Sequence, residues 1–590
     1  MSQTSSVYLR NLAEAARPYN RRLIIGLIAT VFASVAESSS PMLLKFGIDA
    51  LQASKPNSWL WGIAGLIVLV SAIGGIFRFQ MRDVIIGVSR WVEADIREKF
   101  FKHLLRLPPA FFDKNHTGDL MARATSDVER IRMVVGPGLL YTANTQLTLF
   151  FSAIMMFYVD YKLALMLLLL TPLVGGAVLW IARLLHKANM RQQEVYGELT
   201  TVVQENVSGS RIIKSYARED YEAERFTEVC KRYFTRSLKV AQLQAFMFPL
   251  ITFLIGVGVA GILWIGGTHV AEGSMTLGDF IAFMGYLSLM AWPMIAIGWV
   301  VHLYQGGSAS NIRLNQIFDV PRQFVPIEID GKSDRRRSEQ VPEIAFEGVN
   351  FRYRPEGPDV LTDVSFVIPS GKTVAVVGQT GSGKSSVARL LVRLYEPQLG
   401  KITIDGKNWD DVPVEQLRAG VAYVDQTPFI FSTEIDSNLR LGKPDATAEE
   451  IADAAHTACF DRDVEEFPEQ YRTIIGERGV TLSGGQQQRL TVARALLIDA
   501  PVLVLDDALS AVDTDTEAEI ISRLKRSKTV RTTLLITHRL AAAEAADFVV
   551  VLEKGKIVEF GAPEDLLTLN GVYAEMYKRQ RLSEEIEAST

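Results

Sequence analysis

Two consecutive aspartates, Asp506 and Asp507, close the apolar run 502–505 near the carboxyl end of this 590-residue chain. A site that hydrolyses a nucleotide needs one carboxylate to hold Mg²⁺ and a second to polarise the attacking water. The order of the two acids after a strand-like run assigns the magnesium role to Asp506. We expect Asp507 to act on the water.

A glycine-rich loop upstream would supply the phosphate contacts of such a site. It follows the alternating residues 373–377, which predict a strand, and a helical pattern follows it, which is the setting in which GxxxxGK[ST] binds nucleotides. Loop amides and the helix N-terminus favour anionic phosphate. The expected ATP-binding residues are Gly378, Gln379, Thr380, Gly381, Ser382, Gly383, Lys384 and Ser385. Among them, Lys384 would reach the outer phosphates and the Ser385 hydroxyl would bind Mg²⁺.

Three single residues complete the expected ATP site. Tyr353 follows the predicted strand 344–351, and its ring would stack on adenine. Gln426 ends another strand-like run and would reach Mg²⁺, and His538 follows a further one and would contact the γ-phosphate. Together with Asp507, these two are the expected catalytic residues. An aromatic ring usually packs against neighbours, and a lone histidine is more often a core residue, so the three assignments depend on the neighbouring phosphate loop.

A second anion-binding helix start lies downstream of this loop, at Ser483, Gly484, Gly485 and Gln486, directly before the helical pattern 487–497. A serine and two glycine amides at a helix N-terminus favour bound phosphate. One loop already serves one nucleotide, so we expect the second start to face the nucleotide of another chain. Two chains would then enclose ATP at their interface, closing when ATP binds and separating after hydrolysis.

The first half of the chain has the composition of a membrane domain. The chain is 48% hydrophobic with a mean hydropathy of +0.14, and its length exceeds that of a single core. Apolar stretches of about 20 residues, the length that crosses a bilayer, lie near 23–46, 58–80, 138–159, 163–185, 246–267 and 278–303. The sequence predicts an all-α six-span transmembrane domain over 1–320, a polar linker over 321–342 and an α/β nucleotide domain over 343–590. The net charge of −5 gives no indication of a nucleic-acid partner.

Cationic residues orient the six predicted spans. The connections between spans two and three and between spans four and five are rich in Lys and Arg, whereas the opposite connections have few. We therefore expect a multi-pass protein of the cell membrane with both termini in the cytoplasm. Spans two to five would continue into the cytoplasm as helices that turn near 112–118 and 208–216, where a short helix would dock on the soluble domain. Glu37 lies in the first span, and it either faces a polar cavity or lies near the outer water interface.

Taken together, these motifs resemble the ATP-binding cassette in order and spacing. With six spans ahead of the cassette, the chain resembles a half-transporter of the exporter type, similar to bacterial multidrug and lipid exporters. The resemblance implies an ATPase-coupled translocase with ATP and Mg²⁺ as cofactors and an amphipathic drug or lipid as cargo. It further implies that Asp506 holds Mg²⁺ through water, that Gln426 couples the site to the membrane domain and that 510–513 contacts the opposing subunit. Residues 476–478 resemble the segment that touches the inner helix tips.

The family usually has Glu at the position of Asp507. The aspartate carboxylate is retracted by one methylene, and a misplacement of about 1 Å can cost on the order of 100-fold in rate. We therefore expect this chain's own site to hold ATP and cleave it poorly, while its intact Ser483–Gln486 segment completes the site of a different second subunit. The alternatives are a homodimer in which Asp507 still serves as the base, and an ATP-gated membrane regulator or channel.

Overall fold

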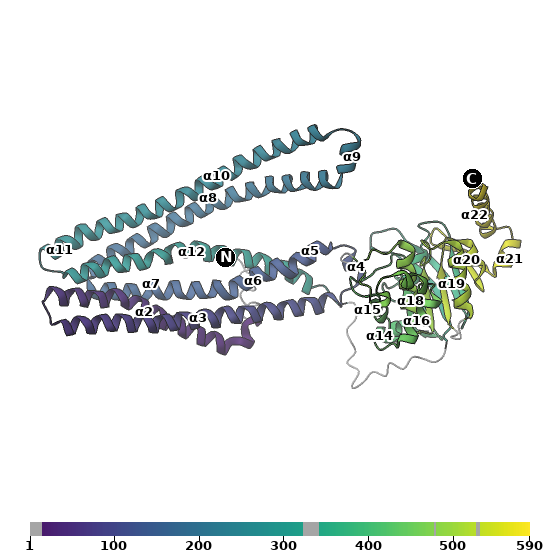
Figure 1. The fold of residues 1–590 in the computed structure, drawn as a ribbon, viewed down its shortest axis with the longest axis horizontal. Helices are drawn as coiled ribbons and strands as arrows, with labels where there is room; N and C mark the ends of the chain where they lie inside the picture. The colour runs from purple at the N-terminus through teal and green to yellow at the C-terminus, as the bar shows by residue number, and fades with distance from the viewer. Residues whose placement is uncertain (1–13, 323–340, 477–479, 527–530, 590) are drawn as a thin grey trace. The chain divides into compact units, whose positions relative to one another are not determined.

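The computed structural model describes residues 14–322, 341–476, 480–526 and 531–589. The chain divides into two compact units. The first comprises Met1–Leu105 and His116–Pro321 and is helical, and the second comprises Arg106–Asn115 and Arg322–Thr590 and is built around two sheets (Figure 1). Most of the predicted linker, residues 323–340, lies outside the described residues.

Long helices form the first unit. Within its described part they are α2 (Asn20–Gln52), α3 (Asn57–Leu104), α7 (Leu139–Val159), α8 (Tyr161–Ser208), α10 (Glu219–Gly261) and α12 (Leu277–Phe318). Each of the six predicted spans falls on one of these helices or on the turns that continue it. Four described segments are long and apolar enough to cross a membrane, namely Glu14–Gln52, Asn57–Leu104, Glu219–Ala271 and Leu277–Phe318. The helical character of the predicted spans is therefore confirmed, and their number in the membrane stays a prediction.

Shorter helical segments extend and connect the long helices. They are η1 (Arg17–Tyr19), α5 (Thr117–Ala122), η2 (Arg123–Asp127), α6 (Val128–Met133), η3 (Val134–Gly138), α9 (Ser210–Ser215), η4 (Ile262–Gly266) and α11 (Gly267–Ala271). The chain is helical without a break from Thr117 to Val159, and α8 and α10 run side by side with α9 at their turn (Figure 1). The predicted long extensions and a short helix at each inner turn are thus present.

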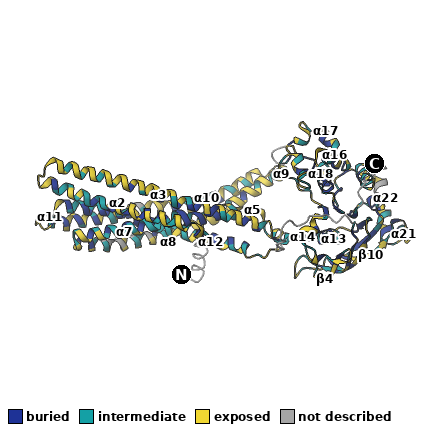
Figure 2. Cartoon of the chain, turned by 90° about the horizontal axis from the view of Figure 1, so that it is seen from below, coloured by how far each residue is buried: buried dark blue, intermediate teal, exposed yellow. Residues whose placement is uncertain are grey.

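Burial in this unit is uneven, as expected where one side faces lipid or another chain. Helix α2 packs closely on α3, since a Cβ on Gly26 would lie 2.6 Å from Ile85. By contrast, much of α3 is coloured as exposed in Figure 2. Its exposed residues include the large apolar Leu69, Ile76 and Phe79. Glu37 lies on α2 with a carboxylate oxygen 3.8 Å from the Arg78 guanidinium of α3, so its charge has a partner.

One buried carboxylate joins the segment before α7 to α12. Asp127 is 3% exposed and accepts hydrogen bonds from Ser310 Oγ at 2.9 Å and from Arg313 Nε at 2.9 Å, with Arg313 Nη2 as a further donor. Burial opposes its ionisation, but the hydrogen bonds and charge of Arg313 outweigh burial and hold the pKa of Asp127 below its usual range.

The second unit contains two sheets. The antiparallel sheet has the order β2-β1-β4-β5, with β1 (Ile344–Phe351), β2 (Leu361–Ile368), β4 (Leu399–Ile404) and β5 (Lys407–Asn408). The other has the order β10-β9-β3-β8-β7-β6, with β3 (Thr373–Val377), β6 (Val421–Val424), β7 (Val502–Asp506), β8 (Thr532–Ile536), β9 (Phe548–Glu553) and β10 (Lys556–Gly561). Its strands are parallel except for β10, which pairs antiparallel with β9. The strands predicted over 344–351 and 373–377 coincide with β1 and β3.

Helices connect the strands of this unit. They are α13 (Lys384–Leu391), η5 (Trp409–Asp411), α14 (Val414–Ala419), α15 (Ile435–Arg440), α16 (Ala448–Thr457), α17 (Asp461–Glu466), η6 (Gln470–Arg472), α18 (Gly484–Leu497), α19 (Thr514–Arg526), α20 (Leu540–Glu544), α21 (Pro563–Thr568) and α22 (Val572–Ser589). Two of them, α13 and α18, begin at predicted site residues. The short helix α4 (Pro109–Phe112) belongs to this unit as well, although it lies between α3 and α5 in the sequence. The expectation that an inner helix tip docks on the soluble domain is therefore confirmed for α4.

Candidate nucleotide-binding site

The phosphate loop connects β3 to α13 through backbone that only glycine adopts without strain. Gly378 has φ +152° and Gly383 has φ +102°. A Cβ on Gly378 would collide with the carbonyl oxygen of Leu552, and one on Gly383 would lie 2.8 Å from Leu361 Cδ2. The glycines at these two positions therefore let the loop lie against β9 and the start of β2 while α13 begins at Lys384.

Lys384 is directed into this loop. Its Nζ donates to the carbonyl oxygens of Gly378 at 2.8 Å and Gln379 at 3.0 Å. Burial lowers the pKa of Lys384, and the negative charges of Asp507 and Asp506 partly oppose this effect. A partly desolvated ammonium group that binds only neutral carbonyls gains when an anionic phosphate replaces them.

Asp506 lies at the end of β7 and is fully buried. Ser385 Oγ donates to its Oδ1 at 2.8 Å, while its Oδ2 is buried and has no hydrogen-bond partner among the described residues. Burial raises the pKa of Asp506 to about 6. An orphaned carboxylate oxygen beside a hydroxyl fits a hard cation such as Mg²⁺, which prefers a few oxygen ligands together with nucleotide phosphates. The described residues contain no group of three or more His, Cys, Asp or Glu that would hold a metal without a nucleotide.

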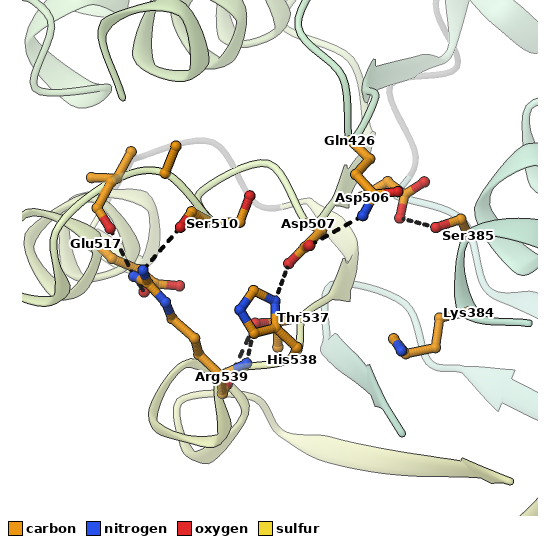
Figure 3. A network of polar contacts seen from close by, with 12 residues as sticks. Lys384, Ser385, Gln426, Asp506, Asp507, Ser510, Glu517, Thr537, His538 and Arg539 are labelled. Carbon is orange, nitrogen blue, oxygen red and sulfur yellow. Dashed lines mark hydrogen bonds and ion pairs between the residues drawn. The ribbon is translucent and has the colours of Figure 1, made fainter. Parts of the chain in front are cut away.

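Asp507 follows in left-handed backbone, with φ +49°, and its N–H donates to Ile536 O at 2.9 Å. Its side chain lies between two of the predicted site residues (Figure 3). Asp507 Oδ1 is 2.7 Å from His538 Nδ1, and Gln426 Nε2 donates to Asp507 Oδ2 at 3.3 Å. The structure thus brings the three predicted catalytic residues together at the carboxyl ends of β6, β7 and β8.

Two residues that the sequence analysis did not identify support this group. Arg539 donates to Glu517 Oε2 at 2.6 Å, to Val512 O at 2.8 Å and to Ser510 O at 3.0 Å (Figure 3). Arg539 directly follows His538 in the sequence. These bonds therefore hold the segment after β8, which carries His538, against the segment that follows Asp507. Burial raises the pKa of Glu517, and the hydrogen bond and charge of Arg539 partly oppose this increase. The only sequence signal for Arg539 was its position beside His538.

Tyr353 lies close to the phosphate loop but is packed among other rings. Its ring centroid is 4.8 Å from that of Phe351 and 5.0 Å from that of Tyr395, both in edge-to-face arrangement. Its hydroxyl is 2.9 Å from Ser386 Oγ on α13. The contact with α13 places Tyr353 beside the loop, and its stacking on adenine stays a prediction.

The predicted second anion-binding helix start coincides with the N-terminus of α18. Ser483 Oγ accepts from Gln486 N–H at 3.3 Å, and Ser483 N–H donates to Gln486 Oε1 at 2.9 Å, which forms a capping box. Gln486 also donates to Asp463 Oδ1 at 3.2 Å. Gly484 and Gly485 occupy the first turn, where backbone N–H groups have no intrahelical partner. The bonds of Ser483 and Gln486 thus join the start of α18 to itself and to α17. Residues 477–479, which include most of the predicted 476–478 segment, lie outside the described part of the chain.

These features define a class of protein. A helical membrane unit and an α/β unit with a phosphate loop, an adjacent carboxylate pair and a second anion-binding helix start form an ATPase-coupled membrane transporter. The ABC transporter transmembrane region matches residues 23–294, and the ABC transporter domain matches residues 361–510.

Comparison with whole proteins agrees with the domain matches. The chain is 34% identical over 583 residues to the probable multidrug resistance ABC transporter ATP-binding/permease protein YheI of Bacillus subtilis, covering 97% of this chain and 98% of that protein. It is 34% identical to the ATP-dependent lipid A-core flippase of Desulfotalea psychrophila, covering 98% and 100%. Among solved structures, a bacterial Atm1-family ABC exporter with ATP bound matches with a TM-score of 0.78 and 26% identity over 95% of this chain and 98% of that one. The chain belongs to the ABC transporter family, as an exporter half-transporter with one membrane region and one ATP-binding domain.

Proposed function

We propose that this chain is one subunit of an ATP-driven exporter in which its own ATP site binds ATP and hydrolyses it slowly. Its Ser483–Gln486 segment completes the active ATP site of a different second subunit. The cargo is an amphipathic drug or lipid, in keeping with relatives named as multidrug resistance transporters and lipid A-core flippases. ATP binding closes the two cassettes, and the long helices transmit that closure to the membrane spans.

The position of the Asp507 carboxylate carries this proposal. A general base must reach the proton of the attacking water at hydrogen-bond distance. Asp507 is one methylene shorter than Glu, and both of its oxygens already contact protein side chains, His538 and Gln426. By contrast, Lys384 donates into the loop and Ser385 donates to Asp506, and these contacts support binding of phosphate and Mg²⁺ by this chain.

The α18 start supports the second half of the proposal. Its capping box keeps Ser483 and Gln486 ordered, and Ala511 N–H donates to Gln488 Oε1 at 2.7 Å, which joins α18 to the segment after Asp507. The N-terminus of a helix favours bound anions, so this ordered start would bind a phosphate of the nucleotide held by the other chain.

A homodimer is the second candidate. The 2.7 Å contact between Asp507 and His538 favours it, because a carboxylate beside a histidine is a competent acid–base pair. In a homodimer, two identical sites would each use Asp507.

The test compares the chain alone with the chain co-expressed with a second half-transporter, chosen from the neighbouring reading frames by having Glu after its magnesium aspartate. The measurement is ATP-dependent accumulation of a fluorescent amphipathic dye or lipid in inverted membrane vesicles, with Lys384→Ala as control. We expect accumulation only from the pair. Equal accumulation by the chain alone would establish the homodimer, and nucleotide-dependent leak without accumulation would establish a gated channel.

A further inference from the structure

The helix tip that docks on the nucleotide unit ends in a hydrogen bond to an aromatic residue. Asp113 directly follows α4, and Tyr395 Oη donates to Asp113 Oδ2 at 2.6 Å. Burial raises the pKa of Tyr395, and the hydrogen bond and charge of Asp113 raise it further. The hydroxyl therefore keeps its proton and remains a donor across the working pH range.

The ring of Tyr395 contacts the residue expected to stack on adenine. Tyr395 and Tyr353 pack edge to face with centroids 5.0 Å apart. Phe351 closes the group, with its ring 4.8 Å from that of Tyr353 and 5.8 Å from that of Tyr395. Because edge-to-face pairs have a preferred geometry, a shift of one ring in this triad displaces the others.

The hydroxyl end of Tyr353 is attached to the phosphate-binding helix. It lies 2.9 Å from Ser386 Oγ, and Arg389 Nη1 donates to it at 3.3 Å. Arg389 also lies 3.9 Å from Asp425, the neighbour of Gln426. The ring of Tyr353 is thus held at one end by Tyr395 and at the other by the helix that carries Ser385.

We propose that Tyr395 is a positioning residue that links the α4 tip to adenine recognition. When Asp113 holds Tyr395, the triad fixes the ring of Tyr353 beside α13, and movement of the tip releases it. The inference rests on the proposed ATP site, in which Tyr353 stacks on the base. It adds a route by which the membrane unit acts on the base of ATP rather than on its phosphates.

Thermodynamic linkage makes the coupling between docking of the α4 tip and ATP binding reciprocal. If the tip changes the affinity for ATP by some factor, ATP changes the affinity of the tip for its docking place by the same factor. The route predicts a base-specific effect, because tripolyphosphate binds to Lys384 and the loop amides without contacting Tyr353.

The experiment measures dissociation constants of ATP and of inorganic tripolyphosphate for the full chain in nanodiscs. In Tyr395→Phe the ring stays and only the hydroxyl is lost. We expect ATP to bind about fivefold more weakly, at the lower end of usual coupling factors, with tripolyphosphate binding unchanged. Asp113→Ala should have the same effect, Asp113→Asn a smaller one because an acceptor oxygen remains, and the double variant Asp113→Ala/Tyr395→Phe no more than either alone.

Matched controls separate the possible failures. Tyr573→Phe removes the hydroxyl of a tyrosine buried in a different cluster, and it should change neither constant. Lys384→Ala should weaken both ligands, and ATP binding unaffected by Lys384→Ala would instead refute the proposed ATP site. If Lys384→Ala acts as expected while Tyr395→Phe leaves ATP binding unchanged, or weakens ATP and tripolyphosphate equally, the link through Tyr353 is wrong.

Discussion

Replacement of Asp507 with glutamate restores the missing methylene at the point where water is activated. One carbon–carbon bond advances the carboxylate by roughly 1.5 Å. A misplacement of about 1 Å costs on the order of 100-fold in rate, which corresponds to about 2.7 kcal/mol in the activation free energy. We therefore expect Asp507→Glu to raise kcat for ATP hydrolysis by the purified chain alone by up to about 100-fold. The KM for ATP should change little, because the phosphate loop is untouched.

The backbone conformation at position 507 makes Asp507→Glu unfavourable for the stability of the fold. Asp507 has φ +49°, and short polar residues tolerate left-handed backbone better than glutamate does. We expect Asp507→Glu to lower the free energy of unfolding by about 1 kcal/mol. A modest fall in melting temperature should therefore accompany the gain in rate.

The assay is phosphate release at saturating MgATP, with Asp507→Asn as a control that keeps the shape and removes the charge. Asparagine should leave the already slow rate of the chain alone almost unchanged. In a complex with a second subunit whose own anion-binding helix start is altered, Asp507→Glu should add little to turnover. The reasoning fails if the unmodified chain alone hydrolyses ATP rapidly, Asp507→Asn abolishes that activity and Asp507→Glu brings no gain.

Three further predictions follow from the contacts described above. In the pair of subunits, Lys384→Ala should abolish ATP-dependent accumulation in inverted vesicles, and retention of transport would show that the phosphate loop is not used. Ser483→Ala removes a helix cap and should lower the free energy of unfolding by about 1 kcal/mol. It should also reduce phosphate release by the complex more than phosphate release by the chain alone. An equal reduction in both would contradict a role in the partner's site. Asp127→Asn breaks the bonds to Arg313 and should lower the free energy of unfolding of the membrane unit by about 2 kcal/mol at pH 7. This loss is smaller than that expected for a fully buried ion pair, because the Arg313 side chain is 40% exposed. Since the folded pKa of Asp127 is lowered, its contribution is complete above the unfolded pKa of about 4 and is lost as the pH falls through the lowered value. The difference in melting temperature between the two proteins should therefore shrink in acid, and a difference that grows there would refute this assignment.

Local patterns predicted much of the fold, because neighbouring residues determine helices, strands and tight loops. The ends of β1 and β3 coincide with the predicted strands, and α13 begins directly after Gly383 as the GxxxxGKS pattern requires. The long helices follow from apolar runs that continue into charged periodic segments, as in α3 and α8. The docking of an inner helix tip was also expected from sequence, but the residues that make it, Asp113 and Tyr395, were not.

The sequence by itself determined which chemistry is possible: a phosphate loop, a magnesium aspartate, and an aspartate where the family has glutamate. Only the tertiary structure decided which side chains meet. Placing β3, β8 and β7 side by side brings His538 to Asp507 and Ser385 to Asp506, although 31 and 121 residues separate the partners. In the same way, docking of α4 joins Asp113 to Tyr395 across 282 residues. The physical reason is that a hydrogen bond acts only within about 3 Å, and the order of strands in a sheet, which local sequence does not specify, sets which distant residues come within that reach.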